Sequence, residues 1–159
     1  MSGGRAVTLR SALWLVLGGW IGSWTFFALV LARLVFRVLP SPEAAGHLVR
    51  PVLDTLHWYG VFAGLVLSVL ALLLRRGRVL VWLPIALTAG CLATQLGVTP
   101  RLEAIREQAF GPDGNVDAAA EYRQLHGVSM AIFSSVLLGA IALVPLHVRR
   151  EASENDRSD

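Results

Sequence analysis

The chain of 159 residues is short enough to form one domain, and 55% of its residues are hydrophobic whereas only 16% are charged. A soluble domain of this size needs more charged residues on its surface, so the composition excludes an ordinary water-soluble protein. The formal net charge is +3 and every basic residue is arginine, but the arginines gather at the ends of apolar segments. We therefore expect no nucleic-acid binding. The single cysteine, Cys91, excludes a disulfide within the chain.

The first apolar segment predicts a transmembrane helix over residues 11–36. Ser11–Ala32 alone would extend roughly 33 Å at ~1.5 Å per residue, enough to cross the hydrocarbon core of a bilayer. A cleaved signal peptide is the alternative, but its apolar region would be only about 7–15 residues long. Because this segment is longer and continues helically through Arg33 and Arg37, we interpret it as an uncleaved anchor.

Prolines divide the segment that follows. Pro40 should end the first helix, and Ser41 should cap a new one with Pro42 in its first turn. Pro51 should kink or break this short helix. The second span is therefore predicted over 52–74.

Three arginines, Arg75, Arg76 and Arg78, interrupt the apolar sequence after the second span. Even one arginine at the centre of a bilayer costs roughly 2.5–3.5 kcal/mol, so these three must lie outside the hydrocarbon. With so short a connection, the second span and a third span over 79–99 should be antiparallel neighbours.

The third span should end near Pro100, and an amphipathic helix outside the membrane should follow over 102–110. Residues 111–114 have the composition of a turn.

A last helix, capped by Asn115 or Asp117, should then contain the fourth span over 126–148. Residues 151–159 are predicted to form a disordered cytoplasmic tail.

Together these elements predict an all-α fold, a polytopic bundle of four transmembrane helices over 11–148. Eight of the fourteen arginines lie at the two chain ends and in the central hairpin. By the positive-inside rule, both termini and the hairpin should face the cytoplasm. The use of arginine without lysine suggests a GC-rich bacterial coding sequence, so we expect a multi-pass protein of the bacterial cytoplasmic membrane.

Glycines four residues apart, Gly18 with Gly22 and Gly60 with Gly64, permit close packing between membrane helices. We expect them to pack the bundle, and we consider a homodimer through these faces or association with another membrane protein.

Thr88, Cys91 and Gln95 share one stripe of the third span. A buried glutamine needs a hydrogen-bond partner, so this stripe should face the interior of the bundle. Interhelical hydrogen bonding is the favoured interpretation, and a substrate path is the alternative.

Charged residues and histidines gather at the helix ends predicted to face outward. The main members of this external cluster are Arg37, Asp54, His57, Arg101, Glu103 and His126, joined by Arg106, Glu107 and Glu121. Two interpretations stay open. In the first, these residues are solvated helix ends with local ion pairs. In the second, they form a site for a ligand or a proton.

His57 and His126 each open an inbound span, as would follow from a weak duplication of the two halves of the chain. Two histidines could bind a transition metal or a haem, although haem bundles usually offer more histidines. The leading expectation is therefore no cofactor and no metal, with a haem- or metal-binding redox protein as the alternative. His47 and His147 are interpreted as residues of the membrane interface.

The sequence also resembles a known family. Phe36-Arg37-x-Leu39-Pro40, Leu92-Ala93-Thr94 leading to Pro100-Arg101, and His126-Gly127-x-Ser129 are similar to motifs of the transmembrane protein 205-like family. The resemblance implies four helices in a membrane and, from its eukaryotic branch, an association with tolerance to platinum drugs. This chain departs from that branch in its short loop between the third and fourth spans.

Phosphate-binding glycine loops, metalloprotease motifs and nucleophile elbows do not occur, so we do not expect an enzyme. The leading hypothesis is a small membrane protein acting in transport, toxic-compound tolerance or membrane assembly. A purely structural subunit is a further option.

Overall fold

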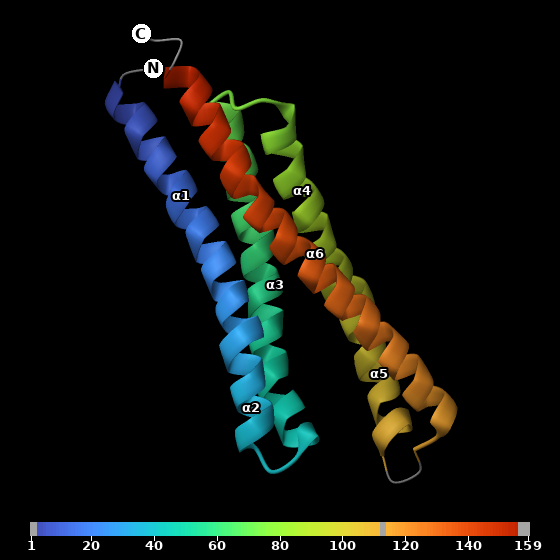
Figure 1. Cartoon of the computed structure of the whole chain (residues 1–159). Helices are drawn as coiled ribbons and strands as arrows, with labels where there is room; N and C mark the ends of the chain where they lie inside the picture. The colour runs from blue at the N-terminus through green and yellow to red at the C-terminus, as the bar shows by residue number, and fades with distance from the viewer. Residues whose placement is uncertain (1–2, 112–113, 156–159) are drawn as a thin grey trace.

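The computed structural model describes residues 3–111 and 114–155, and the regular elements in them are helices that form long rods (Figure 1). The elements in chain order are α1 (Gly3–Phe26), a π-helical segment η1 (Phe27–Leu31), α2 (Ala32–Val38), α3 (Pro42–Leu73), α4 (Arg78–Ala93), a π-helical segment η2 (Thr94–Val98), α5 (Thr99–Phe110) and α6 (Val116–Asn155). Each π-helical segment joins its two neighbours into one continuous rod.

In the described part of the chain, four helices are long and apolar enough to cross a membrane. They are Gly4–Val38, Ala44–Leu73, Arg78–Phe110 and Val116–Glu154. Their outer faces expose large apolar side chains such as Leu15, Phe62 and Leu138, which are 76%, 59% and 66% exposed. Such a surface suits lipid and not water. The prediction of an all-α fold with four helices able to span a membrane is confirmed.

The helices form a ring in which α3 packs against α1 and α4, while α6 packs against α1, α4 and α5. Consequently α3 and α6 lie across a diagonal. The start of α1, the α3–α4 connection and the end of α6 lie at one end, the hairpin end (Figure 1). At the opposite end, the splayed end, the α2–α3 pair diverges from the α5–α6 pair.

Two glycines allow α3 and α4 to approach closely. A Cβ atom on Gly60 would lie 2.8 Å from Sγ of Cys91, and one on Gly64 would overlap the Thr88 hydroxyl. By contrast, Gly18 and Gly22 of α1 have open space beside them. The homodimer contact considered for this face of α1 stays a prediction.

Two helix starts agree with the sequence-based expectations. The Ser41 hydroxyl accepts a hydrogen bond from the Ala44 amide at 3.1 Å, which caps α3. The Asn115 side-chain oxygen accepts one from the Ala118 amide at 2.7 Å, which caps α6. Both predicted caps are confirmed. The predicted turn over 111–114 includes residues 112–113, which lie outside the described residues.

The break predicted as one outcome at Pro51 does not occur, and the helical rod also continues past Pro100. Pro51 lies inside α3, which continues without a break from Pro42 to Leu73. Pro100 lies in the first turn of α5, where its missing N–H needs no partner, and the rod continues through η2. A proline removes one backbone hydrogen bond, and membrane helices tolerate that loss when neighbouring helices hold the chain.

The predicted disordered tail over 151–159 is also corrected. Residues 151–155 continue α6, whereas 156–159 lie outside the described residues. Glu151 and Glu154 in this last part of α6 face Arg76 at the α3–α4 connection. This attraction gives the end of the helix a reason to stay folded.

The close approach of α3 to α4 predicts that Gly64→Ala destabilises the protein. The added methyl group must displace Thr88 or the Pro84 carbonyl, and such overpacking costs about 1–3 kcal/mol. The matched change Gly18→Ala meets open space and should leave stability unchanged or raise it by up to ~1 kcal/mol. Thermal unfolding in detergent measures both, and equal melting temperatures for the two variants would contradict this packing.

Candidate functional site

A buried histidine, His57, lies on α3 inside the bundle with only 1% of its surface exposed. Its Nδ1 atom lies 2.8 Å from the carbonyl oxygen of Leu53, which can only accept, so Nδ1 carries the proton and donates. In the neutral ring Nε2 is then an acceptor. Nε2 is buried and has no hydrogen-bond partner in the described part of the chain.

An aromatic group formed by side chains of α1 and α6 reaches this histidine through Trp24. Trp24 contacts His57 edge to face, with ring centroids 5.5 Å apart, and stacks on Phe133 at 4.4 Å. Trp20 contacts Trp24 edge to face at 6.5 Å. Both indole Nε1 donors are buried, and neither has a partner among the described residues.

The wall opposite is made by α4 and η2. Gly60 faces Cys91 across the α3–α4 contact, and the two helices run antiparallel. Gln95 lies four residues after Cys91 in the π-helical segment η2, which contacts α3. The Oε1 atom of Gln95 is buried, and the described residues offer it no partner either. The nearby Thr94 hydroxyl, in contrast, donates to its own helix at the Gly90 carbonyl.

These residues form what we call the His57 cluster, consisting of Trp20, Trp24, His57 and Gln95. It contains two N–H donors and two acceptors that lack protein partners. Inside lipid, water is not available to replace a missing partner, and each unsatisfied group costs several kcal/mol. The described residues therefore leave hydrogen-bonding capacity of both kinds unused beside an aromatic cluster.

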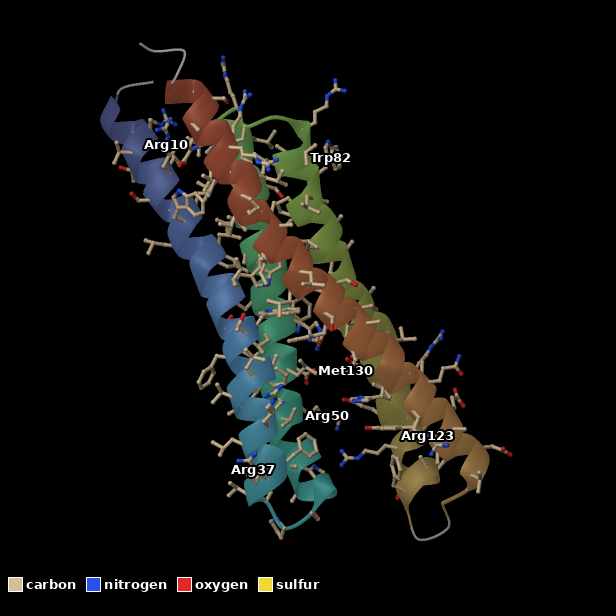
Figure 2. The ribbon with its side chains drawn as sticks, viewed as in Figure 1. Arg10, Arg37, Arg50, Trp82, Arg123 and Met130 are labelled. Carbon is tan, nitrogen blue, oxygen red and sulfur yellow. The ribbon has the colours of Figure 1, made fainter. Side chains whose placement is uncertain are left out.

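The members of the predicted external cluster differ in their exposure. Arg37, Arg101, Glu103 and His126 are exposed, Asp54 is half-buried, and His57 is buried. Figure 2 shows Arg37 and Arg50 in the α2–α3 pair and Arg123 in the α5–α6 pair at the splayed end.

One ion pair of the external cluster bridges the diverging pairs of helices. Arg50 of α3 pairs with Glu103 of α5, with an N–O distance of 2.5 Å. Beside it, the Arg106 guanidinium lies 3.6 Å from the position a Cβ on Gly46 would take. Sequence reasoning included Glu103 but missed Arg50, because nothing local in the sequence connects residues so far apart.

The two histidines of the alternative metal or haem site have different surroundings. His57 is enclosed between α1 and α3, whereas His126 is exposed on α6 and its ring stacks on Tyr122 with centroids 6.4 Å apart. Within residues 3–111 and 114–155, no group of three or more His, Cys, Asp or Glu side chains could hold a metal ion. The geometry does not favour a shared site for His57 and His126.

A second polar group at the hairpin end was missed by sequence reasoning. The Arg76 side chain is completely buried, and its Nη2 atom donates to Glu151 at 2.6 Å. Nη1 of Arg76 lies 3.6 Å from Glu154, which also pairs with Arg10 at 3.1 Å. The available signal was a pair of glutamates directly after Arg149 and Arg150, three apart on one helical face.

His147 also differs from its interpretation as an interface residue. It is fully buried in α6, and its ring contacts Trp14 of α1 edge to face with centroids 6.1 Å apart. The side chain therefore packs α6 against α1 near the hairpin end.

The burial of Arg76 predicts that removal of its acidic partners is costly. The double change Glu151→Ala and Glu154→Ala leaves a buried guanidinium without a counter-charge, which should cost about 3–5 kcal/mol. Glu103→Ala removes one half of a surface pair and should cost only ~0–1 kcal/mol. Denaturant unfolding in detergent compares the variants, and similar losses for both would contradict a structural role for the buried pair.

Comparison with known proteins adds one finding. A family model described as a domain of unknown function (DUF4149) matches residues 15–111. The match includes all four members of the His57 cluster but not Phe133 or His126. No curated protein and no solved structure matches the chain significantly.

Proposed function

The chain belongs to the DUF4149 family, a domain of unknown function, and we propose that it binds a small molecule between its membrane helices, as in transport or in tolerance to toxic compounds. In this proposal the protein is a multi-pass protein of the bacterial cytoplasmic membrane and not an enzyme. It is a bacterial counterpart of the transmembrane protein 205-like proteins whose motifs it resembles.

The single observation that carries the proposal is the set of unpartnered polar atoms in the His57 cluster. A bundle selected for packing alone would gain stability by replacing His57 with an apolar residue of similar size. A polar or ionisable side chain within a membrane helix is therefore a functional candidate by default. The cluster lies at the junction of α1, α3 and η2, so a bound molecule would contact both halves of the matched domain.

The ion pair between Arg50 and Glu103 supports access from the splayed end. It is partly exposed, with 35% and 48% of the two side chains open to solvent, so it is weak enough to break and re-form. In this proposal, its opening separates the α2–α3 pair from the α5–α6 pair and admits the molecule toward His57.

The functional test uses His57→Phe, which keeps the aromatic volume and removes the unpartnered Nε2 atom. Cells lacking the native copy are complemented with the wild-type chain, His57→Phe or His126→Ala, and challenged with cisplatin, the probe that the family resemblance suggests. We expect the wild type and His126→Ala to change growth inhibition and cellular platinum content equally. His57→Phe should reduce both effects clearly below those of the wild type, while its melting temperature stays at least as high as that of the wild type.

A His57→Phe variant that protects as well as the wild type would refute the role of the cluster. In reconstituted protein, His57→Phe should weaken the binding of a molecule in the His57 cluster by about tenfold at most, because the variant loses one hydrogen bond to that molecule.

We also propose that both termini and the residues 75–78 face the cytoplasm, as the distribution of arginines suggests. The test places single cysteines by Arg78→Cys or Gln108→Cys in a Cys91→Ala background. A membrane-impermeant maleimide should label the Gln108→Cys variant in intact cells and the Arg78→Cys variant only after the membrane is opened. The reverse pattern would overturn this orientation.

A further inference from the structure

A shallow depression of about 360 Å³ lies at the hairpin end, between the α3–α4 connection and the end of α6. Four arginines line it: Arg76, Arg78, Arg149 and Arg150. Apolar side chains including Val79 and Leu146 line another part of its wall. The depression therefore combines strong positive charge with an apolar surface.

The buried member, Arg76, has donors to spare. Its side chain is completely buried, its Nη2 atom is bonded to Glu151 and its Nη1 atom lies 3.6 Å from Glu154, but Nε has no hydrogen-bond partner in the described part of the chain. A guanidinium presents five N–H donors in a fixed plane, and phosphate oxygens fit that plane well. Arg76 lines the depression and keeps its Nε donor unused among the described residues, which is an observation independent of the exposed arginines.

The charges around the depression do not cancel. Glu151 pairs with Arg76, and Glu154 is shared among Arg76, Arg10 and Arg150. Arg78 and Arg149 are exposed and form no ion pair with the described residues. Among the described residues, two positive charges at the rim are therefore left without a counter-charge.

The start of α4 adds to the same field. Gly77 precedes this 16-residue helix and provides no side-chain cap, so the first amide N–H groups of α4 keep their hydrogen-bonding capacity. The positive end of the helix dipole lies there as well, and helix starts of this kind bind phosphate.

The position of the depression along the bundle indicates where its ligand comes from. Trp82 lies near the start of α4 at the hairpin end and is 64% exposed, as expected of a side chain at the level of lipid head groups (Figure 2). Val79, one turn earlier, is 63% exposed. Basic pockets beside membrane helices at this level recognise anionic lipid head groups.

We propose that this depression binds a phosphate group, held by Arg76, Arg78 and Arg149 and the start of α4, and that an anionic phospholipid supplies it. The acyl chains would follow the apolar wall at Val79 and Leu146. The site is separate from the His57 cluster, and its existence does not depend on the function proposed for that cluster.

The test is native mass spectrometry of the full chain in detergent with added phosphatidylglycerol or phosphatidylcholine. The wild type should retain phosphatidylglycerol in preference to phosphatidylcholine. The double variant Arg78→Gln, Arg149→Gln should retain phosphatidylglycerol about 30-fold more weakly, and each single variant about fivefold more weakly. The matched control Arg33→Gln, Arg37→Gln makes the same charge change at exposed positions of the opposite end and should behave as the wild type.

Inorganic phosphate distinguishes the two sources of the anion. If a lipid is the ligand, phosphate added alone should neither displace phosphatidylglycerol nor raise the melting temperature. If free phosphate is the ligand, it should displace phosphatidylglycerol and raise the melting temperature of the wild type, and it should have neither effect on the double variant. That result would overturn the lipid as the source of the phosphate group but would support the phosphate site. The site itself is refuted if the double variant, or both single variants, retain phosphatidylglycerol like the wild type. The site is also refuted if the control variant Arg33→Gln, Arg37→Gln loses as much phosphatidylglycerol retention as the double variant.

Discussion

Polar groups between these helices must find their partners inside the protein, because lipid cannot supply them. This constraint shapes both the course of the backbone and the packing of the side chains. The backbone satisfies this constraint by forming continuous helical rods. The rods continue through Pro51 and Pro100, with the π-helical segment η2 before Pro100, and they tolerate the backbone hydrogen bonds that prolines remove. The side chains satisfy this constraint unevenly at two levels of the bundle, the hairpin end and the middle.

At the hairpin end the constraint is met by charge pairing. The buried Arg76 finds two glutamates on the last turns of α6, and Arg10 and Arg150 share one of them. These contacts join the first, second and last rods. In the middle of the bundle, the packing of α1 on α3 brings Trp24 against His57, with Trp20 beside Trp24, and the indole Nε1 atoms and His57 Nε2 have no partner among the described residues. A group left unsatisfied among well-packed neighbours needs an explanation, and a bound polar molecule supplies one.

The sequence predicts the features of this fold that depend on local pattern. Apolar length and interrupting arginines locate the four rods, and the caps at Ser41 and Asn115 follow from residue type alone. Features that depend on distant neighbours could not be predicted. From the sequence alone Pro51 suggests a break, because its cost is local, whereas the packing that holds α3 together comes from neighbouring helices along its whole length. Likewise, Arg76 and Glu151 are far apart in the chain. From the sequence alone each would be interpreted as a solvated charge, and only the folded structure shows that they pair. The same reason limits the site: His57 is visible as a candidate in the sequence, but its indole neighbours are not.

The most direct measurement is the nuclear magnetic resonance spectrum of the indole N–H groups, recorded on the full chain in lipid nanodiscs. If the His57 cluster holds a polar molecule, the indole protons of Trp20 and Trp24 will show cross-peaks to water or to a molecule that is not protein. Their chemical shifts will be those of hydrogen-bonded groups. Indole protons at both positions with the shifts of free N–H groups, and with no such cross-peaks, would show a dry and empty interior and would contradict the account.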